Sequence, residues 1–190
     1  MTEADDDLAL ARRALGGEDR AFTALMRRHK DGLFRFVRRY VGDADAAYEV
    51  TQEAFVAAWR ALDRFDGRRP FATWLRAIAL NKCRDRGRRL AVRRIVFGER
   101  PADAPEALRA PDRGPTPEAA LADAELRATL DKAIARLPAK LKEPLLLTYF
   151  ADMTQQEAAD VLGVSVKAVE TRAYRARQRL AGMLAHLADR

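Results

Sequence analysis

The C-terminal part of the chain carries cations at helical spacing, and these residues could bind nucleic acid. On a helix, Ala168, Thr171, Arg172, Arg175 and Arg179 would share one face, because they recur at three- and four-residue steps. Small side chains come first on this face and arginines follow. A helix that reads DNA has this order, since its first residues meet base edges and its longer cations reach bases or phosphates. The alternative is a helical hairpin whose arginines only meet water.

The residues around this face predict a helix-turn-helix. Thr154 and Glu157 have the spacing of a capping box, which begins a helix. Gly163 ends that helix, and Ser165 caps the next one after a very short turn. The second helix also has an apolar stripe that predicts a buried face: Val166, Val169, Ala173, Ala176 and Leu180. Together these features favour DNA binding over a solvated hairpin.

A second basic region lies in the middle of the chain. Between Arg60 and Arg100 there are 13 basic residues and four acidic ones, an excess that can follow a phosphate backbone. Asn81 is the best candidate here for polar readout, since an amide both donates and accepts hydrogen bonds. Trp74 lies at helical steps from other apolar residues, which favours a core position over a platform for stacking bases.

Composition excludes several other functions. The net charge of +7 favours a polyanionic partner. Cys83 is the only cysteine, and His29 and His186 are far apart, so we expect no metal site, no cofactor and no catalytic residues. We expect Cys83 to be structural and His29 to lie on the surface. The acidic N-terminus shows no secretory signal, and no apolar run reaches the roughly 18 residues needed to span a bilayer, so we expect a cytoplasmic protein without stable membrane insertion.

Helical periodicity dominates the sequence and predicts an all-α fold. The expected helices cover residues 6–15, 20–41, 45–62, 70–89, 118–136 and 140–150, followed by the two helices of the helix-turn-helix. A loop is expected at Asp63–Arg69. Pro144 must lie in the first turn of its helix or kink it, because proline cannot donate the backbone hydrogen bond.

A proline-rich segment divides the chain. Five of the eight prolines lie between Gly98 and Pro117, which is typical of a flexible linker. We therefore predict two small helical domains, at residues 1–95 and 118–190, joined by a linker at residues 96–117. The second domain contains the helix-turn-helix.

Both predicted domains resemble parts of one protein family. Leu137–Leu180 ("LPAKLKEPLLLTYFADMTQQEAADVLGVSVKAVETRAYRARQRL") is similar to region 4 of bacterial sigma factors of the extracytoplasmic-function group. Asp43–Leu62 ("DADAAYEVTQEAFVAAWRAL") resembles region 2.2, and Phe65–Arg89 resembles regions 2.3 and 2.4. Many relatives have Glu-Asp where this chain has Tyr48-Glu49. The two resemblances occur in the family's order and cover most of the chain.

The resemblance implies a subunit that binds core RNA polymerase and directs promoter-specific initiation. Its partners would be the polymerase clamp and flap, promoter DNA and an anti-sigma factor. For the −35 duplex it implies contacts from Ser165, Lys167, Ala168, Thr171, Arg172, Arg175 and Arg179. For the melted −10 strand it implies contacts from Phe65, Arg68, Arg69, Arg76, Asn81, Lys82, Arg84 and Arg88. For the clamp it implies contacts from Asp45, Glu49, Gln52, Glu53 and Phe55. Leu145, Leu146 and Leu147 would mostly form core.

Three other hypotheses remain at the level of sequence. A decoy with a sigma-like fold would bind an anti-sigma factor without reading DNA, but the arginines of the recognition helix argue against it. An autonomous helix-turn-helix regulator would leave the first domain without a purpose. An enzyme is the least favoured class, because no cluster of acid, base, nucleophile or metal ligand is present.

Overall fold

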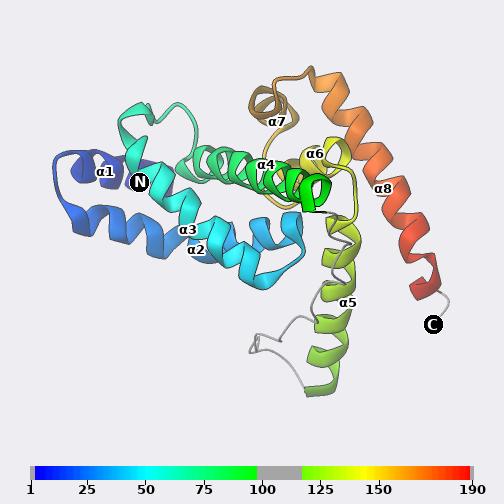
Figure 1. Cartoon of the computed structure of the whole chain (residues 1–190). Helices are drawn as coiled ribbons and strands as arrows, with labels where there is room; N and C mark the ends of the chain where they lie inside the picture. Colours follow the sequence, from blue (N-terminus) through cyan, green and yellow to red (C-terminus); the bar gives the residue numbers. More distant parts are fainter. Residues whose placement is uncertain (1–2, 98–116, 189–190) are drawn as a thin grey trace. The chain divides into compact units, whose positions relative to one another are not determined.

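The computed structural model describes residues 3–97 and 117–188, and every regular element within those ranges is a helix (Figure 1). The prediction of an all-α fold is confirmed. The chain divides into two compact units: unit 1 comprises Met1–Val37 and Asp45–Arg100, and unit 2 comprises Arg38–Ala44 and Pro101–Arg190. The predicted linker, residues 96–117, lies mostly outside the described ranges.

Unit 1 is built around an apolar core. It contains α1 (Glu3–Leu15), most of α2 (Asp19–Val41), α3 (Ala44–Arg60), the short 3-10 helix η1 (Leu62–Arg64) and α4 (Phe71–Phe97). The largest fully buried side chains come from all of these elements except α1: Leu25, Phe36, Val37, Val50, Leu62, Phe71, Leu75 and Leu80. The apolar stripes of three long helices therefore face one core, and α1 packs against η1 and α4.

Helix α4 is longer than predicted. It begins after Pro70, whose carbonyl accepts hydrogen bonds from the amides of Thr73 and Trp74 (3.0 and 3.2 Å). It then runs to Phe97, past the predicted end at Arg89. The sequence contains no glycine or proline between these last two positions, so nothing interrupts the helix. The prediction was wrong because it ended the helix with the run of arginines.

Unit 2 contains α5 (Pro117–Ala135), α6 (Ala139–Tyr149), α7 (Gln155–Leu162) and α8 (Val166–Ala188). Helix α8 packs against the other three. The core includes Ile134, Leu146, Leu147, Ala158, Val169 and Ala176. Leu145, Leu146 and Leu147 are all buried, as predicted.

Pro144 lies beyond the first turn of α6, inside the helix. Its ring removes the N–H that would donate to the carbonyl of Lys140, yet the helix continues to Tyr149. Pro144 is buried, so apolar packing of its ring accompanies the missing hydrogen bond.

The predicted signals between α7 and α8 are present in the structure. The Thr154 hydroxyl accepts a hydrogen bond from the Glu157 amide (3.2 Å), and the Glu157 carboxylate accepts one from the Thr154 amide (2.8 Å). Gly163 ends α7 with a φ of 65°, in the left-handed region that favours glycine. The Ser165 hydroxyl then accepts from the Ala168 amide (3.2 Å) at the start of α8. The helix-turn-helix is therefore closed by local hydrogen bonds on both sides of the turn.

Candidate functional site

One face of α8 carries most of the predicted −35 residues. We call it the recognition face, and it consists of Ala168, Thr171, Arg172, Arg175 and Arg179. Val169, Ala173, Ala176 and Leu180 are buried against the rest of unit 2, so the residues between them point outward. Thr171 and Arg172 are half-buried, and Arg175 is exposed. The Thr171 hydroxyl donates to the carbonyl of Lys167 (2.8 Å), which fixes the side chain against its own helix. This face combines a small side chain with arginines, as base and phosphate contacts require.

Lys167 and Arg177 do not belong to the centre of this face. The ammonium of Lys167 lies 3.5 Å from the carboxylate of Glu170. The guanidinium of Arg177 lies over two exposed rings, 5.3 Å from the centre of Tyr149 and 5.9 Å from that of Tyr174. Unit 2 therefore displays a second surface of aromatic and cationic groups beside the recognition face.

Four of the five predicted −10 residues on α4 fall into two groups, and the fifth, Lys82, is half-buried. Asn81, Arg84 and Arg88 follow one another at three- and four-residue steps, so they share one side of the helix. The Arg84 guanidinium donates to the Asn81 side-chain oxygen at 3.3 Å, and Arg88 pairs with Asp85. Arg76 instead borders a polar cavity of about 430 Å³ between α2 and α4. A DNA strand that runs along Asn81, Arg84 and Arg88 would therefore not reach Arg76, which lies on another side of α4.

The loop that carries the predicted −10 residues Phe65, Arg68 and Arg69 is held by an aromatic cluster. Phe65 is only 8% exposed, and its ring centre lies 5.3 Å from those of Phe71 and Trp74. Trp74 is half-buried in this cluster, as expected for a core residue. The exposed part of the loop is therefore Asp66–Arg69 rather than the Phe65 ring. Within it, the Arg68 amide donates to the Asp66 carboxylate at 3.0 Å.

Two of the three acids of α3 are paired with arginines of α4. Glu49 accepts a hydrogen bond from Arg86 at 2.9 Å, and Glu53 lies 3.6 Å from Arg89. Asp45 and Gln52 are exposed on the same helix. Sequence reasoning missed Arg86 and Arg89, because a pairing between two helices depends on how the helices pack.

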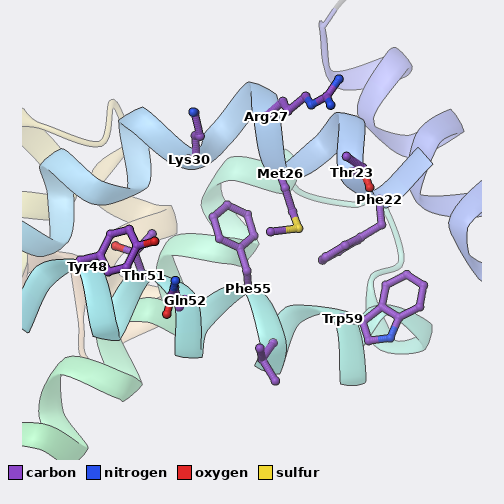
Figure 2. A pocket seen from close by; sticks show the side chains of 11 residues that line it. Phe22, Thr23, Met26, Arg27, Lys30, Tyr48, Thr51, Gln52, Phe55 and Trp59 are labelled. Atoms are coloured by element: carbon purple, nitrogen blue, oxygen red, sulfur yellow. The ribbon is translucent and has the colours of Figure 1, made fainter. Parts of the chain in front are cut away.

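An apolar groove lies between α2 and α3 (Figure 2). Its volume is about 620 Å³. The lining residues are Phe22, Thr23, Met26, Arg27, Lys30, Tyr48, Thr51, Gln52, Phe55, Val56 and Trp59. Figure 2 shows Met26 of α2 and Phe55 of α3 pointing into the space between the two helices, while Arg27 and Lys30 point away from it.

Large apolar side chains remain exposed at this groove. Val56 is 50% exposed and Trp59 is 43% exposed, with the Trp59 ring 4.8 Å from that of Phe22. Sequence reasoning found Phe55 but missed the residues of α2. The signal available was the four-residue step from Phe22 to Met26, which puts both on one helix face. Exposed apolar surface of this kind marks an interaction site.

Residues 3–97 and 117–188 contain no group of three or more His, Cys, Asp or Glu side chains that could hold a metal ion. Within the same ranges, no helix is long and apolar enough to cross a membrane.

Comparisons with known proteins place the chain in a family. Residues 25–93 match Sigma-70 region 2, and residues 127–180 match Sigma-70, region 4. The chain is 40% identical over 185 residues to RNA polymerase sigma factor CnrH of Cupriavidus metallidurans. The match covers 97% of this chain and 97% of CnrH. It is 31% identical over 175 residues to the ECF RNA polymerase sigma factor SigW of Bacillus subtilis, covering 90% of this chain and 92% of SigW.

A solved structure has the same fold. It contains CnrH in complex with the cytosolic domain of CnrY, and the match has a TM-score of 0.67 and 36% sequence identity. The match covers 96% of this chain and 99% of that chain.

The all-helical units, the helix-turn-helix and these relatives define a class of protein: the promoter-specificity subunits of bacterial RNA polymerase. The chain belongs to the sigma-70 family, in its extracytoplasmic-function group. As a sigma factor, it binds core RNA polymerase and directs promoter-specific transcription initiation.

Proposed function

We propose that this sigma factor binds the polymerase clamp through the α2–α3 groove and the polar surface of α3 beside it. The observation that carries this proposal is the groove itself, because its lining exposes Val56 and Trp59 to solvent. A helix of the partner could bury these side chains, as in other helix-in-groove complexes. Asp45 and Gln52 are exposed on α3 and would supply polar contacts that fix the register of the partner.

DNA contacts are assigned to two other surfaces. In unit 1, the exposed loop Asp66–Arg69 would bind a base of the melted −10 strand, and Asn81, Arg84 and Arg88 would follow its backbone. In unit 2, α8 would enter the major groove of the −35 element with Arg172 and Arg175 near bases. The order of the helices along the chain supports this assignment, since it matches the two family regions.

An anti-sigma factor is the proposed regulator. The solved structure of CnrH contains the cytosolic domain of CnrY, and the present chain is 36% identical to that CnrH chain. An inhibitor that covered the α2–α3 groove would exclude the polymerase from it. Core polymerase and inhibitor would then compete for the same apolar side chains.

The remaining assignments follow from this function. We propose that residues 1–95 and 118–190 act as two domains connected by residues 96–117. The protein would act in the cytoplasm, where core polymerase and DNA are found, and it would have no catalytic activity of its own. Initiation needs from this subunit only binding and positioning.

The polymerase contact can be tested with one substitution in the groove. We expect Val56→Glu to abolish binding to core polymerase. An apolar partner in the groove would remove water from the new carboxylate without giving it a partner, and burying an unpaired charge is costly. Val56 is half-exposed, so the variant should still fold. Leu15→Glu is the matched control, since Leu15 is 51% exposed on α1 and does not line the groove. Binding is measured by co-migration with core polymerase in size-exclusion chromatography.

The same preparation separates the competing functions. Core polymerase with the wild-type chain should initiate at specific promoters of a genomic library in vitro, and Val56→Glu should not support initiation. If the wild-type chain binds an anti-sigma factor but no promoter is used, the decoy hypothesis replaces this one. Equal polymerase binding by Val56→Glu and wild type would instead move the clamp contact away from the groove.

A further inference from the structure

The N-terminal helix α1 touches the exposed loop at its glycine. Gly67 has a φ of +72°, and a Cβ added there would lie 2.7 Å from Cδ1 of Leu8 and 3.0 Å from Cδ2. Real side chains do not approach this closely, so the loop backbone rests directly on the Leu8 side chain. The Leu8 side chain therefore fills the space beside Gly67, where any other residue would place its Cβ.

Helix α1 is itself fixed to α2 by a buried carboxylate. The side chain of Asp7 is only 5% exposed, and it pairs with Arg28 (2.6 Å) and with Nε2 of His29 (2.7 Å). Asp6 pairs with the same arginine, and its hydrogen bond, followed by that of Asp7, raises the pKa of the Arg28 guanidinium above its ordinary value. This network holds α1 in place one residue before Leu8.

His29 continues the network toward the loop. The sequence predicted a surface position for it, but its side chain is only 16% exposed and its ring centre lies 5.3 Å from that of Phe71. The prediction was wrong because the Asp7 carboxylate of α1 pairs with the His29 ring and Phe71 packs against it. Phe71 in turn packs against Phe65, the residue directly before the loop Asp66–Arg69. The loop is thus supported from α1 on one side and from the aromatic cluster on the other.

We propose that α1 is a positioning element for base recognition, in which Leu8 sets the conformation of the loop Asp66–Arg69. The inference rests on the proposed function, since it assumes that this loop binds a base of the melted −10 strand. Leu8 does not contact DNA in this scheme. It limits the loop to one arrangement, so that a single base fits the loop better than the other three.

The test measures base preference rather than overall binding. Holoenzyme is assembled from core polymerase and the full chain, and it is given DNA with a duplex −35 part and a single-stranded −10 part with randomised bases. Bound strands are sequenced. We expect the wild-type chain to enrich one base at one or more −10 positions. Leu8→Ala should lower the enrichment at the loop-read position by about three- to tenfold, since the loop then has more than one arrangement.

Two controls separate positioning from loss of structure. Leu15→Ala makes the same change on the exposed end of α1 and should leave the enrichment profile unchanged. Leu8→Met keeps an apolar side chain of similar volume and should restore most of the lost enrichment. If α1 has only a structural role, Leu8→Ala will lower the total amount of DNA bound but leave the base enrichment at every −10 position unchanged.

A second pair of variants tests the contact itself. Gly67→Ala strains the left-handed backbone and also meets Leu8, whereas in the Leu8→Ala background only the backbone strain remains. We therefore expect Gly67→Ala to change the enrichment less in the Leu8→Ala background than in wild type. Additive effects of the two substitutions overturn the inference.

The outcomes also separate this inference from the function beneath it. If the wild-type chain shows no base preference at any −10 position, the proposed role of the loop is wrong. If the wild-type chain shows a preference and Leu8→Ala keeps it at full strength, the loop reads DNA without help from α1 and only the inference fails.

Discussion

Arg172 and Arg177 lie on the same helix but in different surroundings, and this difference allows a matched test of the recognition face. Arg172 faces outward beside Ala168 and Arg175, whereas Arg177 lies over the rings of Tyr149 and Tyr174. We expect Arg172→Ala to weaken −35 binding by about 1–3 kcal/mol if the arginine makes a bidentate base contact. Holoenzyme affinity for −35 duplexes with single base changes is the measurement.

The variant Arg177→Ala and the affinities for the different −35 duplexes together show whether Arg172 contacts a base or a phosphate. Arg177→Ala removes the same charge from the same helix and should change −35 affinity much less. A loss that is equal on every DNA sequence would show that Arg172 binds phosphate instead of a base. An equal loss in both variants would mean that net charge, and not the recognition face, determines the affinity.

For single residues, the sequence predicted which positions of a helix are buried better than it predicted which side chains touch each other. Four of the five residues predicted for the buried stripe of α8 are buried, as are the three leucines of α6, because helical periodicity is local. The fifth, Val166, is half-buried at the first position of the helix. Burial of His29 and of the Phe65 ring was not expected. Each depends on a contact with another element: His29 with Asp7 of α1, and Phe65 with Trp74 of α4.

Among the elements, α7 offers a direct test of how local signals position the recognition helix. Thr154→Ala removes the side-chain acceptor of the capping box, and we expect unit 2 to lose about 0.5–2 kcal/mol of stability. Thr154→Ser keeps the hydroxyl and should retain most of that stability. Chemical denaturation followed by circular dichroism measures both variants. An unchanged midpoint for Thr154→Ala would show that packing alone holds α7.

The helices could be predicted from sequence, whereas the surfaces between them could not. Caps, glycines and prolines placed the ends of most helices within a few residues. The end of α4 was misplaced, since no local signal marks it before Gly98. The α2–α3 groove and the Glu49–Arg86 pair need the register between two packed helices, and no single helix contains that information.

For the whole molecule, charge predicts strong salt dependence of promoter binding. The chain has a net charge of +7, and Arg84 and Arg88 lie on one side of α4. For each phosphate contact to a single strand, the logarithm of the affinity should fall with a slope of about −0.7 against the logarithm of salt concentration. We expect Arg84→Gln and Arg88→Gln each to reduce the slope of holoenzyme binding to a −10 strand by about this amount.

A paired arginine on another helix provides the control for that titration. Arg13 of α1 pairs with Glu18 at 2.6 Å, and its hydrogen bond lowers the pKa of the Glu18 carboxyl. Arg13→Gln removes the same charge and should leave the salt slope unchanged. A reduced slope for Arg13→Gln would indicate that the DNA senses the total charge of the chain and not a defined track along α4.

The thiol of Cys83 can report when the core of unit 1 opens. Cys83 is the only cysteine of the chain and is 1% exposed. A thiol reagent can reach it only when unit 1 opens, because a buried thiol is inert while it is packed. The rate of labelling under native conditions therefore reports the opening of unit 1, while unit 2 contributes no signal. Slower labelling after addition of polymerase or an inhibitor would show, without any engineered probe, how strongly each partner closes unit 1.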